Sequence, residues 1–280
     1  MYYQIGVLSS FTLLLIIIHL HLTINSFEKQ NATLSVYLCS QFPSSQGYFQ
    51  NNFTDSFLLN YPKICKPDDI LLIYILSKVE HIQQRKRIRQ TWANKYQYGQ
   101  LFQTCFIFLI GLTNDSQQIF SEAKTYGDLV QVNINETDES NVYQEIAGLK
   151  WSYIYASHIP YLFKTRDSIM IDTLLLSDIT RLLIDNRIVH SDYLQKHYEL
   201  KNFTEDLLFE NKYTLFKGTE RLGIKTIRRG KFALNYLAWN GDYLPEYCSS
   251  AGYLLSSLIR DRLYQASLCF GINFLKLFLN

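Results

Sequence analysis

The sequence has few charged residues and few cysteines for its length. Charged residues make up 19% of the 280 positions, and the net charge is only +2. A surface that binds nucleic acid needs clustered basic residues, so this balance gives no reason to expect a nucleic-acid partner. The five cysteines form no C-x-x-C pair, and no group of histidines and cysteines suggests a zinc site. Nucleic-acid binding and structural zinc are therefore not expected.

Apolar and aromatic residues are plentiful instead. Hydrophobic residues make up 48% of the chain, with 21 tyrosines and 18 phenylalanines. This composition can bury a core and is not that of a disordered protein. A chain of 280 residues has room for one domain of roughly 200 residues with appendages, and a second full domain is not expected.

The N-terminal region predicts a membrane anchor. Residues 5–24 are almost continuously apolar, and about 20 apolar residues span a bilayer core. A cleaved signal peptide is the alternative, but the run is long for one and does not end in an A-x-A pattern. We therefore expect a cytosolic stub at 1–4, a transmembrane signal anchor at 5–24, a polar luminal stem at 25–66 and a folded domain at 67–280.

N-glycosylation motifs indicate which side of the membrane the domain faces. Such motifs are used only in a lumen or outside the cell. Five of them occur, at Asn31, Asn52, Asn114, Asn135 and Asn202. They favour a type II protein with its domain in the lumen. In that oxidising space the five cysteines are compatible with one or two disulfides, whose pairing stays open.

Strand-like and helix-like segments alternate along the folded part. Apolar runs of strand length occur at 70–76, 105–110, 129–134 and 161–164. Helical patterns occur at 81–95 and 116–124, then from 137 or 138 onward with Tyr143, Ile146, Ala147 and Ile154 on one face, and at 172–184. This alternation predicts an α/β fold with a largely parallel sheet.

The polar residues 165–168 come directly after the buried strand at 161–164. Ligands of open α/β sheets sit beyond the carboxyl ends of the strands, so this cluster is the first candidate site. An ordinary polar turn between two strands is the alternative reading.

Five segments in order resemble the β1,3-galactosyltransferase family, which also holds related N-acetylglucosaminyltransferases. Residues 85–92, RKRIRQTW, fit its R-x-x-I-R-x-T-W signature. Residues 108–111 are similar to its F-L-L-G strand, Glu122 with 126–129 to E-x3-Y-G-D-I/L, 148–151 to G-L-R/K-W, and 243–256 to Y-P-P-Y-C-S-G-x-G-Y-V-L-S. The resemblance covers about residues 70–273.

The resemblance implies a type II Golgi membrane enzyme with a GT-A (Rossmann-like) domain, its mostly parallel central sheet flanked by helices. It implies transfer of galactose or N-acetylglucosamine from a UDP-sugar to a glycan on a glycoprotein or glycolipid, in β1,3 linkage, with inversion and helped by Mn²⁺. Such chemistry needs a charge to neutralise the departing diphosphate and a base to take the acceptor proton. Both requirements predict acidic residues.

At the metal motif the sequence departs from the family. The family's D-D-D aligns with Arg166-Asp167-Ser168, and hard cations need several oxygen ligands. Asp167 is then a weak metal ligand or a ribose contact. Alternatively Arg166 replaces the ion, since a guanidinium forms bidentate bonds to phosphate and keeps its charge. The competing reading is a decayed site with Arg166 in solvent.

The base motif departs as well. The family's E-D-V-x-x-G aligns with residues 266–271, so Ser267 occupies the position of the catalytic acid. Asp261 is the only acid after Cys248, and we expect it on a solvated helix face. A C-terminus that is incomplete would explain this loss.

The remaining candidate residues come from the resemblance. Arg85, Arg89 and Lys164 are expected near the nucleotide-sugar, with a solvated helix face as the alternative for the arginines. Tyr247 and Gly252 are expected to bind the acceptor, although Tyr247 suits packing equally. Two functions remain: a Golgi hexosyltransferase, or a non-catalytic relative that binds nucleotide sugar or glycan or assists an active partner enzyme.

Overall fold

The structure is a computed structural model that describes residues 57–94, 96, 103–112, 116–135, 140–185, 215–221, 223–229, 233, 236, 241–244 and 247–269. The chain divides into two compact units, and the larger, made of Asn52–Thr219 and Ser250–Tyr264, contains most of the sheet and the candidate site. The smaller unit includes Glu220–Ser249 and Gln265–Asn280. Each unit is considered by itself.

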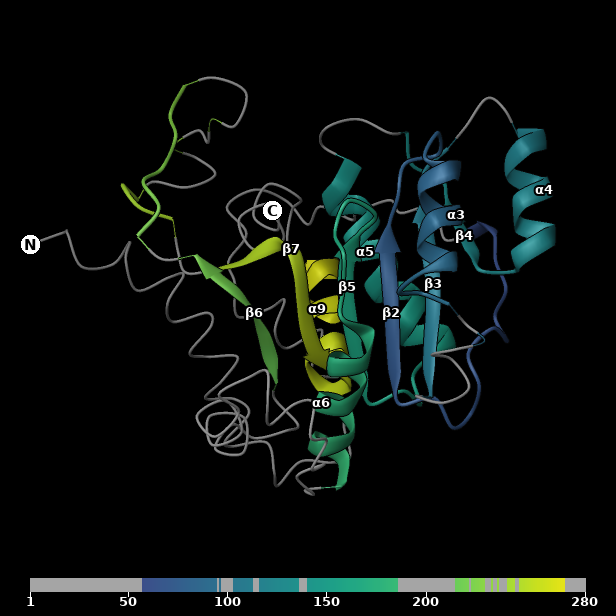
Figure 1. Cartoon of the computed structure of the whole chain (residues 1–280). Helices are drawn as coiled ribbons and strands as arrows, with labels where there is room; N and C mark the ends of the chain where they lie inside the picture. The colour runs from purple at the N-terminus through teal and green to yellow at the C-terminus, as the bar shows by residue number, and fades with distance from the viewer. Residues whose placement is uncertain are drawn as a thin grey trace, which may run out of the picture. The chain divides into compact units, whose positions relative to one another are not determined.

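The described strands form one seven-stranded sheet in the order β1-β4-β3-β2-β5-β7-β6 (Figure 1). Their bounds are Phe57–Leu59 for β1, Leu71–Leu76 for β2, Thr104–Ile110 for β3, Leu129–Val132 for β4, Tyr161–Arg166 for β5, Phe216–Arg221 for β6 and Tyr247–Ser256 for β7. β2 runs parallel to β3 and β5, and β3 parallel to β4. β1 and β7 pair antiparallel with β4 and β5. The predicted parallel sheet is confirmed for its centre, but the sheet as a whole is mixed.

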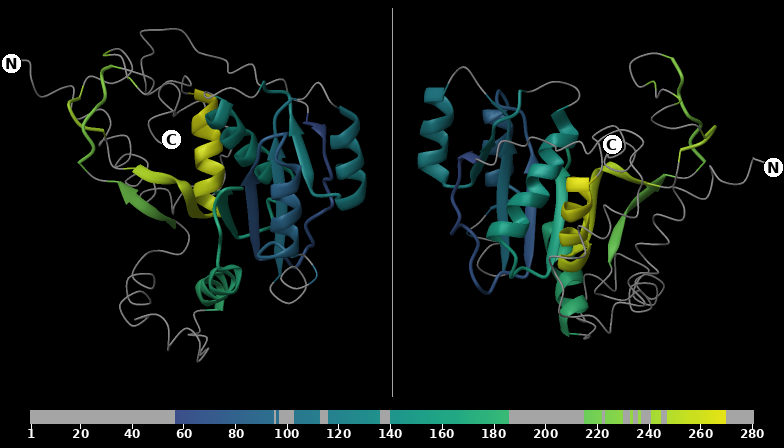
Figure 2. Two further views of the ribbon diagram at one scale, coloured as in Figure 1. Left: turned by 45° about the horizontal axis from the view of Figure 1, so that its top comes forward. Right: turned by 180° about the vertical axis from the view of Figure 1, so that it is seen from behind.

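Helices cover both faces of this sheet. Their bounds are Ile82–Gln90 for α3, Ser116–Tyr126 for α4, Ser140–Tyr155 for α5, Thr173–Asp185 for α6 and Ser257–Cys269 for α9. Apolar residues of α3, α4 and α6 join one core cluster with alternate residues of β2 and β3. α5 and the first turns of α9 lie against the opposite face (Figure 2). This is the α/β layering that the alternating pattern predicted.

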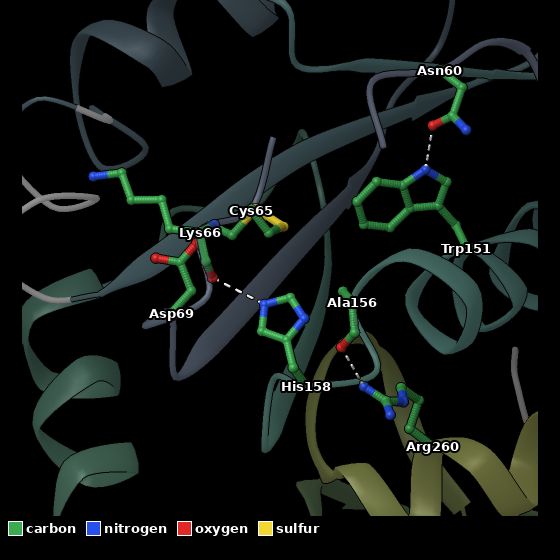
Figure 3. The surroundings of a disulfide bond; sticks show 9 residues. Asn60, Cys65, Lys66, Asp69, Trp151, Ala156, His158 and Arg260 are labelled. Atoms are coloured by element: carbon green, nitrogen blue, oxygen red, sulfur yellow. Dashed lines mark hydrogen bonds between the residues drawn. A yellow bond between two sulfur atoms is a disulfide. The ribbon is translucent and has the colours of Figure 1, made fainter. Parts of the chain in front are cut away.

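Every residue of β2 and β3 is buried, which explains their continuous apolar runs. α5 approaches the sheet closely at Gly148, where an added Cβ would lie 2.7 Å from Cε2 of Tyr74. Trp151 is fully buried on the same helix, and its Nε1 donates to Oδ1 of Asn60 at 2.7 Å (Figure 3). The segment G-L-K-W is therefore a packing motif.

Two helix predictions need correction. The basic helix predicted at 81–95 ends at Gln90, because Thr91 leaves helical geometry with φ −119° and ψ −113°. Ile154 was predicted on the buried face of α5 but is 47% exposed. Trp151 and Tyr155, whose ring centroids lie 5.6 Å apart, make the packing contacts of this last turn instead.

A disulfide joins Cys65, ahead of β2, to Cys105 in β3 (Figure 3). Asp69 lies beside it and accepts a hydrogen bond from the amide of Lys66 at 2.6 Å. The two sulfurs and the Asp69 carboxylate lie within 4.8 Å of one another, but sulfurs bonded to each other are not the thiolates that bind metals. β1 pairs with β4 and Cys65 is bonded to β3, so both parts of the predicted stem are attached to the sheet.

Among the described residues, no helix combines the length and apolar character needed to cross a bilayer. The predicted anchor at 5–24 lies outside the described residues, as do the predicted glycosylation sites Asn31, Asn52, Asn114 and Asn202. Asn135 is described and exposed, so its side chain is accessible.

Candidate functional site

The candidate site lies where the carboxyl ends of β2 and β5 meet. These two parallel strands are neighbours in the middle of the sheet, with Leu76 paired to Arg166 (Figure 1). β3 and β4 continue the sheet on one side of β2, whereas β5 lies on the other. Such a reversal of strand order opens a crevice at the carboxyl ends, where open α/β sheets bind their ligands.

Asp167 ties these strand ends together. Its Oδ2 accepts a hydrogen bond from Oγ of Ser77 at 2.7 Å and lies 2.7 Å from Nδ1 of His81. Its amide donates to the carbonyl of Leu76 at 3.1 Å, and its own carbonyl accepts from Nε2 of Gln84 at 2.9 Å. Asp167 is only 8% exposed. These bonds connect the end of β5 to the end of β2 and to α3.

The described donor set does not fit a manganese ion. A hard divalent cation prefers several carboxylate or carbonyl oxygens, but the described motif supplies one carboxylate, and Oδ2 of Asp167 is already engaged twice. Arg166 places a permanent positive charge next to it in the chain. In the part of the chain that the structure describes, the compact group of metal-ligating side chains is the one around the Cys65–Cys105 disulfide. Weak metal binding by Asp167 stays a prediction.

A second set of charges lies beneath the end of β5. Lys164 and Arg166 alternate along the strand, so both side chains face α5. The ammonium group of Lys164 forms an ion pair with Oε1 of Glu145, and Nη2 of Arg166 lies 3.9 Å from the same oxygen. Glu145 and Lys164 are fully buried, whereas the side chain of Arg166 is 25% exposed. Only Arg166 of these three reaches the surface.

Burial and the charge of the paired residue have opposite effects on the pKa values of Glu145 and Lys164. Burial raises the pKa of Glu145 above its ordinary value, and the charges of Lys164 and Arg166 offset this only in part. Burial lowers the pKa of Lys164, although Glu145 opposes the shift. The Lys164 side chain has no exposed surface. The geometry therefore favours a supporting role for Lys164 over the predicted direct contact with a nucleotide-sugar.

Arg85 is buried with all its N–H groups engaged. Its guanidinium donates to both carboxylate oxygens of Glu122, at 2.9 and 2.7 Å, and to Oγ of Ser77 at 3.0 Å. It also donates to the carbonyls of Lys78 and Val79, at 2.5 and 3.1 Å. The side chain is 0% exposed. Arg85 therefore holds the loop after β2 and supports Ser77, and its predicted role near a nucleotide-sugar stays a prediction.

Arg89 extends the same network. It donates two bonds of 2.7 Å to the Asp128 carboxylate and one of 2.7 Å to Glu122. Its guanidinium carbon lies 4.6 Å from the ring centroid of Phe108 and 4.1 Å from that of Tyr126. The predicted nucleotide contact at Arg89 stays a prediction; its side chain is 9% exposed and is bound to two acids.

Sequence reasoning missed that two of the recognised segments bind each other. Arg85 and Arg89 pair with acids of the segment 122–129, and the available signal was their complementary charge. Burial would raise the pKa of Glu122, but its bonds to Arg85 and then to Arg89 lower it below the ordinary value. Since Arg85 contacts Ser77, and Ser77 contacts Asp167, the network reaches the candidate site.

An open hollow of about 580 Å³ lies beside this network, lined by Ile82 of α3 and by residues of α4. Its lining residues from α4 are Gln117, Gln118, Ser121, Glu122, Thr125 and Tyr126. Neither Arg166 nor Asp167 lines it, so it is separate from the strand-end site.

The residues predicted at the acceptor and base positions lie in different surroundings. Gly252 pairs with Thr165, and an added Cβ there would lie 3.0 Å from both the Lys164 carbonyl and Cζ of Phe163. Glycine is thus needed for close packing of β7 on β5, and acceptor binding stays a prediction. Tyr247 begins β7, but its side chain lies outside the described part. Ser267, which the resemblance aligns with the catalytic acid of the family, is on α9 and is 1% exposed, and that alignment stays a prediction.

Comparison with known proteins matches the galactosyltransferase family to residues 83–276. Beta-1,3-galactosyltransferase 2 of Pongo abelii is 24% identical over 228 residues, which cover 79% of this chain and 48% of the relative. UDP-GlcNAc:betaGal beta-1,3-N-acetylglucosaminyltransferase 7 of Rattus norvegicus is 24% identical over 220 residues, 75% of this chain and 49% of the relative. Lactosylceramide 1,3-N-acetyl-beta-D-glucosaminyltransferase A of Danio rerio is 24% identical over 256 residues, 87% and 59% respectively. The chain spans about half the length of the curated relatives it matches.

Proposed function

The chain belongs to the galactosyltransferase family, and we propose on this basis that it is a hexosyltransferase. It transfers galactose or N-acetylglucosamine from a UDP-sugar to a glycan acceptor on a glycoprotein or glycolipid, in β1,3 linkage. The observation that carries the proposal is the meeting of Ser77, Arg166 and Asp167 at the carboxyl ends of β2 and β5. This is the edge of an α/β sheet that binds nucleotides in many folds.

The proposed location is the Golgi membrane, in type II orientation, with the anchor at 5–24 and the domain in the lumen. The Cys65–Cys105 disulfide supports this location, because disulfides persist in oxidising compartments. The exposed glycosylation motif at Asn135 supports it as well.

The reaction is a displacement at the anomeric carbon of the donor sugar. The oxygen of the acceptor hydroxyl forms a bond to this carbon and its proton passes to solvent, while the bond to the diphosphate breaks and UDP leaves with the electron pair. The described donor set does not fit the manganese ion that the resemblance implies, so no step of the reaction is assigned to that ion. In this chain Ser77 and His81 orient the Asp167 carboxylate at the strand ends.

A second candidate function is that of a non-catalytic relative that binds a nucleotide sugar or glycan or assists an active partner enzyme. The observation that favours it is Ser267, a buried hydroxyl where the family motif carries its catalytic acid. A hydroxyl is a much poorer general base near neutral pH than a carboxylate.

A transfer assay separates the two functions. The chain is incubated with radiolabelled UDP-galactose or UDP-N-acetylglucosamine and a panel of glycan acceptors. We expect labelled product from the unmodified chain. The control is a triple variant, Arg166→Asp, Ser168→Asp and Ser267→Asp, which restores the family's acids. If only the triple variant forms product, the unmodified chain is not a transferase, and the second candidate function is the correct one.

A further inference from the structure

A row of buried side chains crosses the sheet beneath the candidate site. Lys164 on β5 is paired with Tyr74 on β2 and with Tyr253 on β7, and all three are buried. Glu145 of α5 closes the row, since its Oε1 pairs with Lys164 and its Oε2 accepts a bond of 3.3 Å from the Tyr253 hydroxyl. A carboxylate is rarely left fully buried unless cations and hydrogen bonds compensate it. The row therefore fixes Glu145 in place.

Glu145 acts on the strand end through Arg166. Arg166 lies two residues after Lys164 on β5. Its Nη2 atom is 3.9 Å from Oε1 of Glu145. Glu145 therefore has two cationic neighbours, Lys164 at its Oε1 atom and Arg166 at 3.9 Å from the same atom. The Arg166 side chain remains 25% exposed at the carboxyl end of the strand. The planar N–H fork of a guanidinium matches the geometry of phosphate oxygens.

The family resemblance implies a metal ion at this position, and the described residues do not supply its ligands, as the bonds of Asp167 indicate. We propose that Arg166, held in place by Glu145, binds the diphosphate of a uridine nucleotide and takes the role of the divalent ion. The inference rests on the proposed function, because it assumes that a nucleotide occupies the strand ends. It adds a metal-independent mode of binding and assigns Glu145 as a positioning residue.

The chemistry of a guanidinium suits this role. It donates parallel hydrogen bonds to two phosphate oxygens and keeps its positive charge throughout the accessible pH range. When the bond between the sugar and the diphosphate breaks, the electron pair remains on a phosphate oxygen. Hydrogen bonds from Arg166 would stabilise that developing charge. No redox partner or further reactant is needed.

Calorimetric titration of the full-length chain with UDP and with uridine tests the proposal, each in Mn²⁺ and in EDTA. We expect UDP to bind equally well with and without the metal. Arg166→Ala should weaken UDP binding about 10- to 100-fold, the loss expected for charge-assisted hydrogen bonds, and should leave uridine binding unchanged. Lys78→Ala is the matched control, because Lys78 is an exposed cation that follows β2 at the same edge of the sheet.

Glu145→Gln tests the positioning role. It should weaken UDP binding severalfold with little effect on uridine, and should have no further effect when Arg166 is already alanine. A merely structural role for Glu145 would instead weaken UDP and uridine binding alike. If Glu145→Gln does not fold, the Arg166→Ala comparison still decides the proposal.

The outcomes separate this proposal from the proposed function. UDP affinity that depends on Mn²⁺, or that survives Arg166→Ala, would overturn the arginine site and leave a nucleotide-binding protein. Failure of the unmodified chain to bind either UDP or uridine under both conditions would overturn the nucleotide site itself.

Discussion

Replacing Glu122 with glutamine is expected to lower the free energy of unfolding by about 3–5 kcal/mol, the usual cost of removing one partner from a buried ion pair. The Glu122 side chain is 4% exposed and accepts bonds from both Arg85 and Arg89. Its loss leaves two largely buried guanidinium groups with fewer negative charges. Urea unfolding of the variant and the parent chain measures the difference.

Glu80→Gln is the matched control for this variant. Glu80 pairs with Lys78 at 3.9 Å, but both side chains are more than half exposed, and such surface pairs contribute less than about 1 kcal/mol. Equal effects of the two substitutions would contradict the account of the buried network.

The effect of Glu122→Gln should also depend on pH. Arg85 and Arg89 lower the pKa of Glu122 in the folded chain, against the opposing effect of burial. A carboxyl group with a lowered folded pKa stabilises the protein above its unfolded pKa, and that contribution is lost as the pH falls through the folded value. The stability difference should therefore be full above about pH 5 and shrink at lower pH. A difference that does not change with pH would argue against the ion pairs.

Removing the disulfide should have a comparable effect. The Cys65–Cys105 bond closes a loop with a sequence separation of 40, for which loop-closure entropy gives about 4 kcal/mol. The double variant Cys65→Ser, Cys105→Ser should unfold at lower urea concentration than the parent, and a reducing agent should destabilise the parent chain to the same extent. If reduction left the midpoint of the parent unchanged, this bond would not form in solution.

The sheet centre was predictable because burial on both faces leaves a simple pattern. β2 and β3 read as continuous apolar runs, and both proved to be fully buried strands. β1 was missed because it has only three residues in a polar stretch and depends on pairing with β4. The exposed position of Ile154 was missed as well, because helical spacing does not show where a neighbouring element ends.

The sequence motifs identified residues that lie close together at the site. They did not predict which residues these side chains contact. Arg85 and Lys164 were expected near a nucleotide-sugar, and the sequence did not show that each is buried against an acid from another element, Glu122 or Glu145. Such pairings depend on the three-dimensional fold. The contacts of Asp167 with Ser77 and His81 could not be predicted from the sequence for the same reason. The position of Arg166 and Asp167 at a strand end could be predicted, since it follows from an apolar run that stops at polar residues.

Hydrogen–deuterium exchange of the full-length chain with and without UDP tests most directly whether the carboxyl ends of β2 and β5 form the nucleotide site. Amides in 77–84 and 164–168 should exchange more slowly when UDP is bound, whereas those in 65–69, near the disulfide and before β2, should not change. Slower exchange confined to segments other than 77–84 and 164–168 would contradict the assignment of the site.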